Sequence, residues 1–134
     1  MPTDYIMRMV DEFVRVMARV LFFREMKQYV NAIDELDNLS KMMTGLELGQ
    51  IKELGIEGVK NFFELSNYSN VEKVFYSAKA LKEEAAICFE QGNTDEGMKS
   101  MALALGLFEM IKNSGMKDYP GLEEEINIIR RRIN

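Results

Sequence analysis

The chain contains no histidine, no tryptophan, one cysteine and two prolines. The absence of histidine removes the most common acid–base residue near neutral pH, the most common transition-metal ligand and every Ser-His or Cys-His nucleophile pair. A single cysteine, Cys88, excludes an internal disulfide and a cysteine-rich zinc site. We therefore expect no catalytic residues, no metal site and no cofactor.

Positive charge and long apolar runs are also scarce. The chain has 22 acidic and 17 basic residues, which gives a net charge of −5 and works against binding to phosphate backbones or anionic lipid. The longest uncharged stretch, residues 100–108, is too short to cross a bilayer, and the N-terminus lacks the basic and apolar regions of a signal peptide. We expect a cytoplasmic protein that binds neither nucleic acid nor membrane.

The composition is that of an ordinary globular protein, and its pattern is helical. A chain of 134 residues with 47% hydrophobic and 29% charged residues predicts one domain over residues 1–134. Apolar residues recur at spacings of three and four from the start, and no strand-like alternation competes with them. The first run consists of Ile6, Val10, Phe13, Met17 and Leu21. Further apolar residues widen this stripe, which predicts a helix that packs against several neighbours or against a second copy of the chain.

The order of elements follows from the breaks between periodic segments. Glycines interrupt residues 46–68, which predicts short helices there. Ser69 and Glu72 have the spacing of a capping box at the start of a long helix, and Asn93 and Glu96 offer the same chemistry to the next one. A last helix is expected over residues 120–133, because a proline and three glutamates favour a helix start.

The sequence also repeats itself internally. Shifting it by 65 residues places the hairpin 5–45 on the hairpin 70–114, with Ile6 on Val71 and Leu36 on Met101. Apolar or small residues coincide wherever two helices would pack. A duplicated helical hairpin is the prediction.

The turn of the second hairpin, Glu90-Gln91-Gly92-Asn93-Thr94-Asp95-Glu96-Gly97-Met98, resembles that of a tetratricopeptide repeat. Gly97 and Ala104 stand at the two small positions of that repeat, and Ala32 stands at the first of them in the other hairpin. The tryptophan and closing proline of the repeat are missing. The resemblance implies a right-handed superhelix or bundle of about five to seven helices: two long hairpins joined by short helices, with a C-terminal capping helix.

A second resemblance concerns the N-terminus. The opening segment Asp4-Tyr5-Ile6-Met7-Arg8-Met9 is similar to the start of a family of small, functionally uncharacterised bacterial all-helical proteins. It implies no function.

Tetratricopeptide proteins bind extended peptides in a concave groove lined by their inner helices. The matching face of the second hairpin predicts a candidate groove formed by Lys79, Lys82, Ala86 and Phe89. The first hairpin would contribute Val14, Met17 and Leu21. These residues depart from the basic and amide pattern that clamps a peptide carboxylate, so no clamp residue is assigned.

Other residue groups allow a functional and a structural interpretation, and the structural one is favoured each time. The acidic groups, namely Asp34, Glu35 and Asp37, the pair Glu83 and Glu84, and Glu123 to Glu125, are expected on solvated helix faces. Cys88 is expected to be a small buried apolar residue. Among the 11 methionines, Met7, Met26, Met42 and Met116 fit the stripes least and are expected to be exposed.

These observations leave three hypotheses. The first is a non-catalytic protein-interaction or assembly module, an adaptor or scaffold that binds a protein or peptide and that could form a homodimer. The second is a helical bundle that binds a small molecule in an apolar pocket between the long helices. An enzyme is the third and least supported hypothesis.

Overall fold

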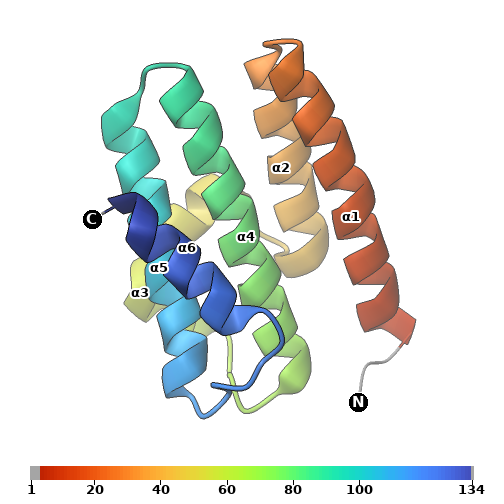
Figure 1. Cartoon of the computed structure of the whole chain (residues 1–134). Coiled ribbons are helices and arrows are strands. Elements are labelled where there is room, and N and C mark those ends of the chain that lie inside the picture. Colours follow the sequence, from red (N-terminus) through yellow and green to blue (C-terminus); the bar gives the residue numbers. More distant parts are fainter. Residues whose placement is uncertain (1–3, 134) are drawn as a thin grey trace.

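The computed structural model describes residues 4–133 and is all-helical over that range. Two antiparallel hairpins dominate it: α1 (Asp4–Glu25) with α2 (Tyr29–Thr44), and α4 (Tyr68–Glu90) with α5 (Thr94–Asn113). The shorter helices are α3 (Leu48–Phe62) between the hairpins and α6 (Leu122–Ile133) after them. Figure 1 shows α4 in the middle of the molecule, α1 and α2 to one side, and α6 in front of α5.

The two hairpins have closely matching helix boundaries. A shift of 65 residues carries α1 onto residues 69–90 and the start of α2 onto residue 94, where α4 and α5 lie. Phe13 of α1 contacts Tyr76 of α4, and further along both helices Arg24 pairs with Glu90. Because the contacts advance in the same direction, α1 and α4 run parallel, as Figure 1 also shows.

The core consists of one cluster of apolar side chains that all six helices share. The small positions of the two hairpins allow its helices to approach closely. A Cβ atom at Gly97 would lie only 2.6 Å from the Phe89 ring, and Ala32 and Ala104 are completely buried. Gly97 therefore leaves room for the Phe89 ring, and the two alanines lie inside the core.

The segment between the hairpins forms two short helical pieces, as expected. Helix α3 runs from Leu48 to Phe62, but Gly55 interrupts it with φ 67° and ψ −173°. This backbone conformation is accessible to glycine alone at low cost. The kink at Gly55 sets the direction of the second half of α3, which packs on α5.

Helix ends were predicted less well than helix bodies. Gly45, the last residue of the predicted hairpin 5–45, ends α2 in the left-handed conformation. The predicted capping box of Ser69 and Glu72 is wrong, because α4 begins at Tyr68. The Asn67 side chain caps the helix instead, by accepting hydrogen bonds from the backbone amides of Ser69 and Asn70. Asn93 precedes α5 but caps it with no side-chain hydrogen bond.

Candidate functional site

The predicted groove residues share one face of α4, and that face is turned toward α6. Lys82 forms an ion pair with Glu125 of α6, and the Nζ of Lys79 lies 3.9 Å from the same carboxylate. The Arg132 guanidinium of α6 lies over the Phe89 ring, 5.8 Å from its centroid. The last helix therefore covers part of the face that was expected to be open.

The cations along this face already have partners within the chain. The Lys79 ammonium lies 5.3 Å from the centre of the Phe13 ring and 5.7 Å from that of Tyr76, a cation–π arrangement. Arg24 of α1 bridges Glu83 and Glu90. What remains open is a cavity of about 200 Å³. It is lined by Arg24, Lys82, Glu83, Ala86, Met101, Ile128, Ile129 and Arg132.

Helix α1 carries a second apolar stripe beside the one that enters the core. Its residues are Met7, Val10, Val14, Met17 and Leu21, spaced alternately by three and four. We call this set the α1 stripe. Each member lies one residue after a core residue, so the stripe is rotated about 100° from the core face. Met7, Val14 and Leu21 are 58%, 62% and 48% exposed.

This exposure is concentrated in the first hairpin. Among residues 4–133, eleven large hydrophobic side chains are exposed, and eight of them belong to α1, α2 or the turn between them. Met7, Met26 and Met42 are exposed as expected. The prediction that Met116 is exposed is wrong, because its side chain is half-buried against the core. The first hairpin thus has the more apolar surface of the two.

Glu84 corrects the expectation that the acidic groups lie on solvated faces. It is 6% exposed and accepts hydrogen bonds from Lys52 Nζ at 2.8 Å and Ser100 Oγ at 3.0 Å. Lys52 also pairs with Glu96 at 2.9 Å. Burial disfavours the charge on Lys52, but the hydrogen bonds to both glutamates outweigh it and raise the pKa of the ammonium. This network joins α3 to α4 and α5.

Cys88 lies near this network and is buried, as predicted. Burial raises the pKa of its thiol, and the charge of Glu84 acts in the same direction. A thiol that stays protonated at neutral pH is a poor nucleophile.

A second buried carboxylate, Glu72, was missed by the sequence analysis. It is 6% exposed and accepts hydrogen bonds from the hydroxyls of Tyr68 and Tyr119. Burial, followed by these contacts, raises the pKa of Tyr119 well above its usual value. The contact fixes the loop before α6 against α4. The only feature of the sequence that indicated burial of Glu72 was its place among the apolar residues Val71, Val74 and Phe75.

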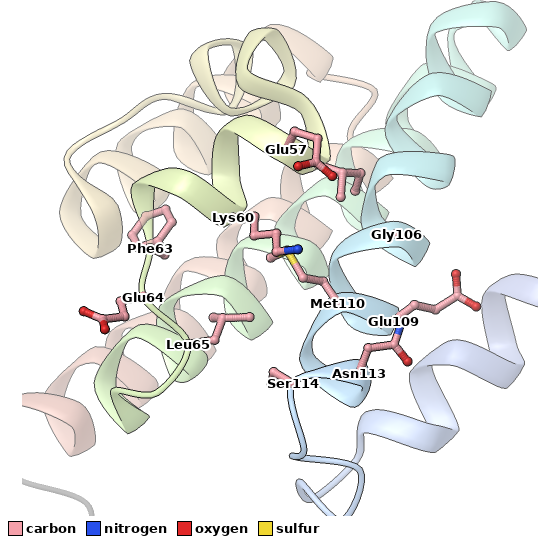
Figure 2. Close-up of a pocket in the computed structure, with 11 residues that line it drawn as sticks. Glu57, Lys60, Phe63, Glu64, Leu65, Gly106, Glu109, Met110, Asn113 and Ser114 are labelled. Atoms are coloured by element: carbon pink, nitrogen blue, oxygen red, sulfur yellow. The ribbon is translucent and has the colours of Figure 1, made fainter.

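A further cavity lies between the second half of α3 and α5 (Figure 2). We call it the α3–α5 cleft. Its volume is about 540 Å³, within the range of small-molecule pockets. It is lined by Ile56, Glu57, Lys60, Phe63, Glu64, Leu65, Gly106, Glu109, Met110, Asn113 and Ser114. The small-molecule hypothesis placed a pocket between the long helices, whereas this one involves the short helix α3.

A glycine allows the two walls of the cleft to meet at one end. A Cβ atom at Gly106 would lie 2.4 Å from Cδ1 of Ile56, so this glycine permits the isoleucine to lie against the α5 backbone. Neither Glu84, Glu72 nor Cys88 lines the cleft or the cavity beside α6. The buried carboxylates therefore hold helices together and do not converge on an open site.

Comparison with family models, curated proteins and solved structures finds no match for this chain. Within residues 4–133, no cluster of three or more carboxylate and cysteine side chains is placed to hold a metal ion. None of the helices described is long and apolar enough to span a membrane. The fold itself defines the class: an all-α protein of two helical hairpins with short helices between and after them.

Proposed function

We propose that this chain is a non-catalytic protein-interaction or assembly module, and that the α1 stripe is its contact surface. The observation that carries the proposal is the exposure of Met7, Val14 and Leu21 at a seven-residue spacing on one helix. Apolar residues repeated at alternating steps of three and four are the pattern by which one helix packs along another. Burying such a stripe removes apolar surface from water and drives association.

The expected occupant is an amphipathic helix of a partner protein, and the first partner to test is a second copy of the chain. A homodimer would cover the same stripe on both copies about a two-fold axis. We place the module in the cytoplasm. The net charge of −5 argues against nucleic acid as a partner.

We also propose that the two hairpins follow a tetratricopeptide-like arrangement. The parallel course of α1 and α4 supports it, as do the close contact at Gly97 and the buried Ala32 and Ala104. In this arrangement the α1 stripe and the candidate groove on α4 belong to neighbouring inner helices.

Light scattering of the purified chain over a range of concentrations tests the assembly proposal. We expect a mass that rises toward twice the 15.5 kDa of one chain. Val14→Glu should return the mass to that of one chain, because association would bury a charged side chain of the α1 stripe without a partner. Met42→Glu is the matched control: Met42 is 45% exposed but lies on α2, away from the stripe.

A mass of one chain at every concentration would overturn the homodimer. Equal effects of Val14→Glu and Met42→Glu would show that association does not use the α1 stripe.

A second candidate function, the binding of a small molecule, is favoured by the α3–α5 cleft. The cleft combines an apolar lining from Ile56, Phe63, Leu65 and Met110 with polar groups at its rim. This is the usual composition of a ligand pocket. An enzymatic role is the least supported, because the buried carboxylates line neither the cleft nor the cavity beside α6.

A further inference from the structure

The internal duplication shows what covers the face of α4 that corresponds to the α1 stripe. A shift of 65 residues carries the five members of the stripe onto Glu72, Phe75, Lys79, Lys82 and Ala86. Glu72 and Phe75 are buried, and the side chains of Lys79 and Lys82 are only 31% and 26% exposed. The same face is thus largely covered on the second hairpin, whereas it is largely exposed on the first.

The cover on α4 is α6, which runs in the same direction as α4. Glu125 of α6 pairs with Lys82. Seven residues later on both helices, the Arg132 guanidinium lies over the Phe89 ring, 5.8 Å from its centroid. Because these contacts advance in the same direction, α6 is parallel to α4 (Figure 1).

The neighbour of α1 does not cover the stripe in this way. Helix α4 contacts Phe13 and Arg24 of α1, but it leaves Met7, Val14 and Leu21 exposed. The internal repeat therefore points to a helix that lies along these three residues and runs parallel to α1.

The chemistry of the stripe decides which helix fits. The α6 helix of a second copy does not fit, because its Glu125 would meet Val14 and Met17 in place of two lysines. Its carboxylate would then be buried without a partner. A second copy of α1 does fit, because its own stripe is apolar throughout and repeats at the same spacing.

We propose that the α1 helix of a second copy covers the α1 stripe, and that the two helices run parallel about a two-fold axis between them. In this pair each member of the stripe meets its own copy. An antiparallel pair centred on Val14 would instead place Met7 against Leu21. The inference rests on the proposed assembly function, and it adds the identity and the direction of the contacting helix.

Disulfide cross-linking of cysteine variants measures this direction. Three variants place a thiol on the stripe: Met7→Cys, Val14→Cys and Leu21→Cys. Each is made together with Cys88→Ala, so that the new thiol is the only one in the chain. In a glutathione redox buffer, we expect each variant to form a covalent species of twice the 15.5 kDa mass of one chain.

Met42→Cys, also made with Cys88→Ala, is the matched control, because Met42 is exposed on α2 and lies away from the stripe. The covalent species should form at least about tenfold faster in the three stripe variants than in this control, because assembly raises the effective concentration of facing thiols.

The end positions of the stripe distinguish the two directions. In an antiparallel pair centred on Val14, the two copies of residue 7 lie about 21 Å apart along the helix, and no disulfide spans that distance. Cross-linking of Val14→Cys alone, with Met7→Cys linking only to Leu21→Cys in an equimolar mixture, would overturn the parallel arrangement. The proposed function would stand in that case.

Two further outcomes concern the contacting helix itself. If no stripe variant cross-links faster than Met42→Cys, the copies do not meet at the α1 stripe, and the homodimer and this inference fail together. A mixture of Val14→Cys and Glu125→Cys tests α6 as the occupant. A link between these two variants would show that α6 of the second copy covers the stripe, and it would overturn the assignment of α1.

Discussion

Asp37 is a residue whose ionisation the fold opposes. Burial raises the pKa of its carboxyl, the amide of Leu48 lowers it by donating a hydrogen bond, and the nearby charge of Glu84 raises it again, with a net increase. The folded state therefore holds a proton at a pH where the unfolded chain has lost it. It follows that Asp37 contributes to the free energy of unfolding at low pH, and that this contribution is lost as the pH rises through the folded-state pKa.

Asp37→Asn should consequently remove a penalty at neutral pH. We expect the variant to be at least as stable as the parent at pH 7, because the asparagine oxygen can still accept from Leu48. The advantage should disappear near pH 4, close to the ordinary pKa of aspartate. Urea unfolding at several pH values measures it, with Asp34→Asn, a site on the same helix, as the control. A variant that is less stable at pH 7 than at pH 4, relative to the parent, would contradict this sign.

Single residues were also where sequence-based prediction failed most. The pattern of charges correctly placed Glu123 and Glu124 in solvent. It could not distinguish Glu84 from them, because the partners of Glu84 lie 32 residues before it, at Lys52, and 16 residues after it, at Ser100. A buried ion pair is a tertiary contact, and the spacing of neighbouring residues in the sequence does not predict it. The same holds for Glu72 and its tyrosines.

At the scale of elements, α3 depends on one glycine. Gly55 has φ 67° and ψ −173°, and both halves of the helix pack into the core through residues such as Ile51 and Val59. A side chain at residue 55 would strain this conformation, although no neighbouring atom lies within 4 Å of the added Cβ. Residue 55 must therefore be glycine because of its backbone conformation, and not because a larger side chain would lack space.

Gly55→Ala should therefore destabilise the chain by about 1–3 kcal/mol. Gly49→Ala is the matched control within α3, because its φ lies outside the left-handed region and the added Cβ meets nothing within 4 Å. That variant should be neutral or more stable by up to about 1 kcal/mol. Urea unfolding measures both free energies. Equal changes in the free energy of unfolding for the two variants would show that the kink does not require glycine at residue 55.

The elements themselves were largely predictable. Apolar spacing and glycine breaks located the hairpins, and the last helix starts at Leu122, two residues from the expected position. These signals are local, so a single sequence contains them. The start of α4 was missed because Asn67 and Ser69 are both good capping residues, and sequence alone does not rank them.

At the scale of the whole molecule, the position of α6 decides which surface stays open. Glu125 of α6 pairs with Lys82, 43 residues earlier, and this contact covers part of the predicted groove on α4. The sequence predicted both the helix and the groove face, but not that one would lie on the other. The uncovered apolar surface therefore lies mainly on the first hairpin.

The proposed function requires that a helix cover the α1 stripe when the chain assembles. Two methionines of the chain provide an internal comparison: Met7 on the stripe is 58% exposed, and Met26 in the turn after α1 is 56% exposed. Side chains of equal exposure should be oxidised by dilute peroxide at similar rates unless a partner shields one of them.

Oxidation followed by peptide mass spectrometry, at concentrations above and below assembly, is the most direct measurement of this claim. We expect Met7 to oxidise more slowly than Met26 in the assembled protein, and the two rates to converge on dilution and in Val14→Glu. Equal rates for Met7 and Met26 in an assembled sample would contradict the assignment of the α1 stripe as the contact surface.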